Sequence, residues 1–291
     1  MVSAAGDAFT PEQRAFLQEA RSISRIAIDR DEPLYRFLRY ATSDDRQTVH
    51  DALVLRHFRF GRPRDFNDPF DCRPHLRLPG RRWFEQETLR LVREKFPGNA
   101  AAEQQAREDL KKFRPEEHVA ATEQRIREQL LDRQQMLCLC GNQRHVLMWA
   151  YYADRHRGVA LHLSSQVWPI AAAKNVTYTN RYPTVSLASA DDLHEIARQF
   201  ALKKARAWRH EDEYRVLVLD DDPARFAVQW ASPSVAIFPA GAVTGVTVGS
   251  LMDDAAVQQV VASARAATPA VPVFQAKAQR KRFMLDFDRI A

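Results

Sequence analysis

The segment Glu213 to Leu219, EYRVLVL, restricts the fold of this chain more than any other. Aromatic and β-branched residues are enriched in strands, and this segment has the strongest β character in the sequence. Its second half, Val216 to Leu219, is an uninterrupted apolar run that has to be buried. The sequence therefore predicts a fold built around a sheet.

Other strand-like and helix-like segments alternate along the chain. Strands are expected at residues 34–38, 55–60, 136–140, 159–163, 176–178, 213–219, 235–238, 243–248, 271–274 and 282–287. Helices are expected at residues 9–24, 43–53, 146–154, 191–208 and 253–266. Because no internal repeat or long linker separates these segments, we expect one α+β domain over residues 1–291, with a central mixed sheet and flanking helices.

Residues 83–131 differ from the rest of the chain. They are charged and almost free of strand-forming residues, and their apolar residues are too sparse for a central core. We expect two or three exposed helices here, forming an insertion or lid with few contacts to the sheet.

Composition excludes several classes of protein. A chain of 291 residues with 45% hydrophobic content can bury a full core. It has no apolar run of about 18 residues, and its N-terminus lacks the basic-then-apolar order of a signal peptide. We therefore expect a cytoplasmic protein with no membrane partner. Cys72, Cys138 and Cys140 are expected to be reduced, buried thiols.

The net charge of +6, from 43 basic and 37 acidic residues, favours a nucleotide or nucleic acid partner. Basic and acidic residues are interleaved along most of the chain, however, so an ordinary arginine-rich composition explains the charge as well. The sequence does not predict an oligomeric state.

The first candidate site segment is Phe66 to Asp71, FNDPFD. Asn67 and Asp68 before a proline are typical of an Asx turn, because short polar side chains bond to the backbone two residues on. Burial of this turn by its phenylalanines would place the Asp68 and Asp71 carboxylates in the interior, where each needs a partner.

The second candidate segment is the aromatic run around Trp149. A helix would place Trp149 and Tyr152 on adjoining faces, with His156 one turn later on the Tyr152 side. Aromatic stripes are usually core, which is the simplest interpretation of Trp149. Tyr152 and His156 instead stand at a helix end just before Gly158, where polar groups commonly line a cleft.

The third candidate segment contains Glu211, Glu213 and Arg215, which would share one face of a strand. Two neighbouring carboxylates repel each other unless a cation compensates, and Lys204 on the preceding helix or Arg215 would supply it. A structural salt-bridge network explains the same pattern, so the cluster is a functional site only if it faces a cavity.

Four segments together resemble the domain-of-unknown-function family 2971 of bacterial proteins: residues 34–36, 66–70, 148–158 and 204–215. Two residues depart from the family pattern: Asp71 stands where the family usually has Glu, and Ala205 where it often has Ser. The family has no settled reaction, so the resemblance implies a shared fold and site but leaves the chemistry to be argued from the residues.

The order of these segments is similar to the layout of ADP-ribosyltransferase-like enzymes. That similarity implies NAD as the cofactor, with an early strand carrying Tyr35 and Arg36 to orient it, Tyr152 on a central helix and Glu213 on a late strand. Glu213 would stabilise the oxocarbenium-like centre formed when nicotinamide leaves, and Arg36 would bind pyrophosphate. Such an enzyme would act on nucleic acid or protein, as a phage-defence or toxin effector.

Two alternatives stay open. In a Mg²⁺-dependent nuclease, Asp68, Asp71, Glu211 and Glu213 would hold the metal and Lys204 would steady the phosphate. In a non-catalytic regulatory module, the same cleft would hold a nucleotide or a partner segment.

The candidate residues are expected to converge in space. The expected catalytic residues are Glu213, Glu211, Tyr152 and Lys204; the expected ligand-binding residues are Tyr35, Arg36, Asn67, Asp68, Asp71, Trp149, His156 and Arg215. Glu213 should have a partner among Lys204, Arg215 and Arg36, and Glu213→Gln should abolish activity while the fold stays nearly intact.

Overall fold

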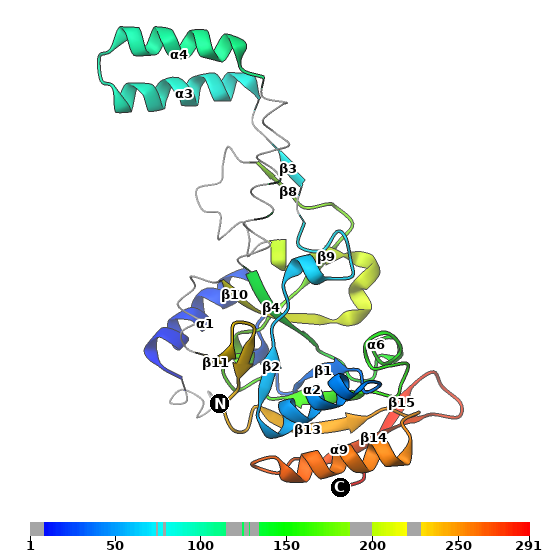
Figure 1. Ribbon diagram of the computed structural model, residues 1–291. Helices are drawn as coiled ribbons and strands as arrows, with labels where there is room; N and C mark the ends of the chain where they lie inside the picture. The colour runs from blue at the N-terminus through cyan, green and yellow to red at the C-terminus, as the bar shows by residue number, and fades with distance from the viewer. Residues whose placement is uncertain are drawn as a thin grey trace.

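The computed structural model describes residues 9–73, 75–77, 80–114, 124, 128, 134–186, 200–219 and 228–291. Its centre is an eight-stranded mixed sheet with the strand order β15-β14-β13-β5-β1-β4-β10-β6 (Figure 1). These strands are β1 (Leu34–Leu38), β4 (Gln134–Cys140), β5 (Val159–Leu163), β6 (Lys174–Asn175), β10 (Glu213–Leu219), β13 (Val243–Val248), β14 (Val273–Ala278) and β15 (Leu285–Arg289). The expected α+β fold with a central mixed sheet is confirmed.

The sheet is antiparallel except for β13 and β14, which pair in parallel. Parallel neighbours need a crossover connection, and helix α9 (Asp254–Ala266) supplies it. Asp253 caps this helix by accepting a hydrogen bond from the Ala256 backbone N–H at 2.8 Å.

The described α-helices are α1 (Pro11–Ile23), α2 (Ser43–Val54), α3 (Arg81–Lys95), α4 (Ala100–Lys112), α6 (Val146–Tyr152) and α9. Thr10 and Thr42 form capping boxes that start α1 and α2, in agreement with the helix starts read from the sequence. None of these described helices is long and apolar enough to cross a membrane.

Alternation along the strands gives the sheet two different faces. On β5, Val159, Leu161 and Leu163 join the main core, which also contains buried residues of α1, α2 and α9. Ala160 points the other way and joins a second cluster with Trp149 of α6. The candidate site lies on this second face.

Helices α3 and α4 form a hairpin that lies apart from the sheet (Figure 1). Neither helix has a buried residue. They hold each other through the Arg93–Glu103 ion pair at 2.9 Å and the Phe84–Phe113 ring contact at 5.7 Å. The expectation of exposed helices in residues 83–131 therefore holds as far as residue 114; the rest, apart from residues 124 and 128, lies outside the described residues.

Several short strands flank the main sheet. A three-stranded sheet contains β2 (His57–Arg59), β12 (Val235–Ile237) and β11 (Gln229–Ser232), and two-stranded pairs join β3 (His75–Arg77) to β8 (Thr184–Ser186) and β7 (Thr177–Thr179) to β9 (Lys203–Ala205). The expectation that residues 176–178 continue the central sheet is wrong. The Thr177 backbone N–H donates to the Leu202 carbonyl at 2.7 Å, which starts the separate β7–β9 pair.

The expected helix over residues 191–208 is wrong at its C-terminal end. Residues 191–199 lie outside the described residues, and the chain from Lys203 forms β9 and then the 3₁₀ helix η6 (Arg206–Glu211). Pairing with β7 outweighs the helical spacing of apolar residues on which the expectation rested. Lys204 consequently lies on a strand, and Trp208 lies on η6.

Candidate functional site

Strand β10 supplies the centre of the candidate site. Tyr214, Val216 and Val218 face the main core, so alternation turns Glu213 and Arg215 to the opposite face. Pairing with β4 sets Glu213 opposite Cys140 and Arg215 opposite Cys138. The predicted shared face of Glu213 and Arg215 is confirmed.

Glu211 reaches the same site by a different route from the one expected. It ends η6 and is not part of the strand, because Asp212 adopts a left-handed conformation with φ 40° and ψ 54°. This turn is packed closely, since a Cβ added at Gly141 would lie 2.2 Å from Oδ2 of Asp212. The turn brings Glu211 beside Glu213 even though the extended strand begins only at Glu213.

Arg215 is fully buried and organises two carboxylates. Its guanidinium donates to both oxygens of Asp71, at 3.0 and 2.6 Å, and to both oxygens of Glu213, at 2.8 and 2.9 Å. A further hydrogen bond of 2.7 Å goes to the Ala201 carbonyl. Buried charges persist when they are paired in this way, so the Arg215 cluster is a structural support for the site.

Lys204 lies where three carboxylates meet. Its ammonium Nζ is 3.4 Å from Asp71 and 3.1 Å from Glu213, and it donates a short hydrogen bond to Glu211. It also lies over the Trp208 ring, 5.2 Å from the ring centroid. Lys204 is thus the cation that allows Glu211 and Glu213 to lie side by side.

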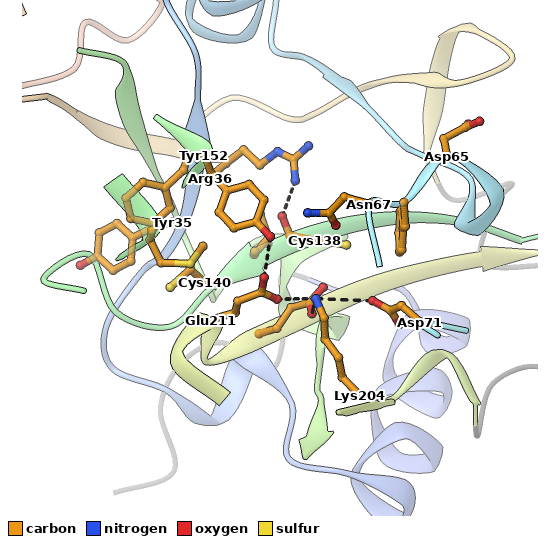
Figure 2. A pocket seen from close by; sticks show the side chains of 15 residues that line it. Tyr35, Arg36, Asp65, Asn67, Asp71, Cys138, Cys140, Tyr152, Lys204 and Glu211 are labelled. Atoms are coloured by element: carbon orange, nitrogen blue, oxygen red, sulfur yellow. Dashed lines mark hydrogen bonds and ion pairs between the residues drawn. The ribbon is translucent and has the colours of Figure 1, made fainter. Parts of the chain in front are cut away.

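Tyr152 completes the site from the end of helix α6. Its hydroxyl donates to Oε1 of Glu211 at 2.6 Å. Asn67 lines the same cavity as Tyr152. Glu211 is therefore held by two donors, the Tyr152 hydroxyl and the Lys204 ammonium (Figure 2).

The two glutamates have opposite pKa shifts. Burial raises the pKa of Glu213, but the opposing attraction of Arg215 and Lys204 is larger in sum and holds that pKa below the ordinary value of 4.5. Burial raises the pKa of Glu211 above 4.5; Lys204 opposes this shift, and the neighbouring Glu213 charge adds to it. Burial alone would lower the pKa of Lys204, but the attraction of Glu213, Glu211 and Asp71 outweighs this effect and raises the pKa.

These groups line a cavity of about 360 Å³, shown in Figure 2. Its lining residues are Tyr35, Arg36, Phe37, Asp65, Phe66, Asn67, Asp71, Cys138, Leu139, Cys140, Met148, Tyr152, Lys204, Glu211 and Glu213. The volume falls in the range of small-molecule sites, and the combination of apolar walls with a few convergent polar groups is typical of them. Arg36 extends across the cavity from β1 and donates to the Cys138 carbonyl at 2.7 Å.

The structure brings together most of the expected site residues. Eight line the cavity: Tyr35, Arg36, Asn67, Asp71, Tyr152, Lys204, Glu211 and Glu213. The other four, Asp68, Trp149, His156 and Arg215, do not line it. Arg215 lies behind the cavity as the partner of two lining carboxylates.

The remaining three residues have other roles. Asp68 caps its own turn by accepting a hydrogen bond from the Phe70 backbone N–H at 2.9 Å. This is the Asx turn that the sequence predicted. Trp149 is fully buried, and its indole N–H donates to the Gln143 carbonyl at 2.7 Å. His156 follows Asp154 and Arg155 in positive φ, so its ring stacks on Trp149 instead of following Tyr152 into the cavity.

Sequence reasoning missed several lining residues, above all Cys138 and Cys140. The signal that identifies them is the pairing of β4 with β10, because directly opposite residues share a face of the sheet. Burial raises the pKa of both thiols, that of Cys140 to about 12, so neither is a thiolate nucleophile at neutral pH. Cys138 and Cys140 therefore form part of the cavity wall.

No family model matches the chain, and neither does any curated protein or solved structure. The resemblances to family 2971 and to ADP-ribosyltransferase-like enzymes stay predictions. The cavity and its chemistry are the basis on which function can be argued.

Proposed function

We propose that the cavity binds NAD and that the protein is an ADP-ribosyltransferase-like enzyme that cleaves the bond between nicotinamide and ribose. The observation that carries this proposal is the placement of Glu211, a cavity-lining carboxyl whose pKa is raised and which is held by Tyr152 and Lys204. Carboxyls in a cleft whose pKa is shifted by burial and by a specific charged partner are candidates for functional sites.

The cavity chemistry fits a flat, positively charged group. Four aromatic side chains lie in its walls, Tyr35, Phe37, Phe66 and Tyr152, and aromatic faces attract cations. Nicotinamide in NAD is a flat cationic ring. The negative charge of Glu211 adds to this attraction, and the guanidinium of Arg36 offers a partner for the phosphates of the same ligand.

The proposed reaction balances without a further cofactor. The bond from C1′ of the ribose to the nicotinamide nitrogen breaks, and its electron pair leaves with nicotinamide, which becomes neutral. Ionised Glu211 stabilises the positive charge that develops on the ribose. A hydroxyl group of the acceptor forms the new bond to C1′, and its proton passes to Glu211, whose raised pKa suits that role.

The structure changes which glutamate we assign to this role. Sequence reasoning assigned it to Glu213, but Arg215 donates to both oxygens of that carboxylate. A charge neutralised in this way stabilises a cation weakly. Glu211 is as deeply buried, but it accepts from the neutral Tyr152 hydroxyl and from a Lys204 ammonium that Asp71 and Glu213 share. Its charge is less compensated than that of Glu213, so we assign Glu211 the catalytic role and Glu213 a structural one.

The Mg²⁺-dependent nuclease receives less support from the geometry. Of the four carboxylates that would hold the metal, Asp68 caps its own turn, and Asp71, Glu211 and Glu213 converge on the Lys204 ammonium. A divalent cation at this point would have to displace a buried lysine.

Release of nicotinamide from NAD tests the proposed function. Wild-type protein should release it, and Glu211→Gln should reduce the rate by about 100-fold or more, because the stabilising charge is lost. Glu94→Gln, the same change at an exposed position on α3, should keep the wild-type rate. If NAD raises the melting temperature of the wild type but no nicotinamide appears, the chain is a binding module and the enzymatic proposal is wrong.

A further inference from the structure

The loop between β14 and β15 carries an exposed aromatic ring among cations. Its six residues, Gln279 to Met284, read QRKRFM. Phe283 has a relative exposure of 102%, so its ring makes no shielding contact with the rest of the protein. Met284 beside it is 39% exposed. Because the Phe283 ring is fully exposed at the tip of a hairpin, it is accessible to a binding partner.

The three residues before Phe283 are all basic and exposed: Arg280, Lys281 and Arg282. Within the part of the chain that the structure describes, none of the three forms a side-chain ion pair or hydrogen bond with a neighbour. Of the nearby acidic residues, Asp288 pairs with Lys277 at 2.7 Å, whereas Asp286 accepts from the neutral Gln279 amide at 2.7 Å and keeps its negative charge. The three positive charges of the tip therefore outnumber the one nearby carboxylate, Asp286, that pairs with no described cation.

We propose that this hairpin tip is a docking site for a single-stranded nucleic acid. Phe283 would stack on an unpaired base, and the three cations would contact the flanking phosphates, which is how sequence-tolerant single-strand binders combine stacking with charge. A duplex offers no free base face to the ring. One ring and one half-exposed methionine provide too little apolar area for stable attachment to a lipid surface.

The strand that follows the tip packs on the face of the sheet that carries the cavity. Arg144, just before α6, donates to the Leu285 carbonyl at 2.9 Å and lies 5.4 Å from the centroid of the Phe287 ring. Leu285 and Phe287 of β15 share one hydrophobic cluster with Met148 and Tyr152 of α6. Figure 1 shows the loop next to α6. The base of the hairpin thus contacts the same helix that carries Tyr152 of the proposed site, but docking of nucleic acid at the tip does not depend on that site's reaction.

Binding of a fluorescent single-stranded 20-mer DNA of mixed sequence tests the role of the ring. Phe283→Ala should weaken binding by about tenfold, while Phe283→Trp should keep or improve it, because stacking survives. The matching duplex should bind the wild type more weakly than the single strand does. The ring touches nothing in the fold, so all variants should melt with the wild type.

Salt dependence tests the role of the cations. Replacing Arg280, Lys281 and Arg282 together with Gln should reduce the slope of log affinity against log salt by about two, since each single-strand phosphate contact contributes about 0.7. The matched control replaces Lys95, Lys111 and Lys112 with Gln, which removes the same charge from the exposed α3–α4 hairpin. This control should leave the slope unchanged.

Three results would overturn the proposal. They are equal losses of affinity in the two triple variants, an unchanged affinity in Phe283→Ala, and tighter binding to phosphatidylserine vesicles than to the oligonucleotide. The first would assign binding to net charge, the second would remove the ring from the interface, and the third would make the tip a membrane contact.

Discussion

Glu211 and Glu213 are two residues apart, yet they have different partners. Glu213 accepts from Arg215 on both oxygens, whereas Glu211 accepts from a tyrosine hydroxyl and shares Lys204. Their opposite pKa shifts follow from this difference. Neighbouring carboxyls with separated pKa values commonly have separate roles, one charged and structural, the other able to exchange protons.

These shifts predict opposite effects on stability. Because the pKa of Glu213 is lowered in the folded protein, its ionised form stabilises the fold at neutral pH, and Glu213→Gln should cost about 3–5 kcal/mol by leaving Arg215 short of a partner. Because the pKa of Glu211 is raised, its ionised form opposes folding at neutral pH, and Glu211→Gln should melt at or above the wild-type temperature.

Chemical denaturation of both variants at pH 7 checks these effects. Equal stability of the two variants would contradict the structural role of Glu213. The sequence alone predicted that Glu213→Gln leaves the fold nearly intact. The structure predicts a loss of stability instead, and this experiment distinguishes the two.

Among the secondary-structure connections, the turn from α6 to β5 is closely packed. Asp154, Arg155 and His156 all have positive φ, and a Cβ added at Gly158 would lie 2.2 Å from the Leu38 carbonyl oxygen. Gly158→Ala should therefore destabilise the protein by about 1–3 kcal/mol or more, because backbone cannot move aside cheaply. In the control Gly61→Ala, the new methyl meets only the Phe66 side chain at 3.6 Å.

Thermal melting distinguishes the two glycine variants. Gly158→Ala should melt clearly earlier than the wild type, and Gly61→Ala should melt close to it. If Gly158→Ala were as stable as the wild type, the close contact between position 158 and the Leu38 carbonyl oxygen would be contradicted.

The α3–α4 hairpin should be dispensable for folding. Neither helix buries a side chain, and the Arg81 guanidinium donates to the Leu110 carbonyl at 3.2 Å, so the two ends of the hairpin lie close together. Replacing residues 81–112 with a short Gly-Ser linker should leave the melting temperature of the sheet unchanged within about 2 °C. A large loss on deletion would mean that the hairpin supports the sheet.

Over the whole molecule, strands with strong composition and periodicity could be predicted from the sequence. Strands β1, β5, β10 and β13 match the expected segments, since each is a short segment rich in aromatic or branched apolar residues. The β9 strand with Lys204 could not be predicted, because it depends on pairing with β7. The sequence pattern alone favoured a helix there.

The candidate site was only partly predictable for a similar reason. Strand alternation identified Glu213 and Arg215, and residue chemistry identified Tyr152 and Lys204. The convergence of Glu211 depends on the left-handed Asp212 turn, and the loss of His156 depends on three positive φ angles. Conformations of this kind are rare in residues other than glycine, so composition gives no sign of them.

The pH dependence of nicotinamide release tests the central claim, that the cavity works through the charge of Glu211, most directly. A carboxylate that must be ionised gives an activity that falls with acid, and its raised pKa moves this fall to a pH above the ordinary value of 4.5. Glu213, with its lowered pKa, stays ionised through this range, so the fold should persist there. Tyr152→Phe removes a donor to the carboxylate and should move the fall to higher pH still. A profile whose acid limb lies at or below pH 4.5, or one that Glu211→Gln leaves in place, would contradict the account.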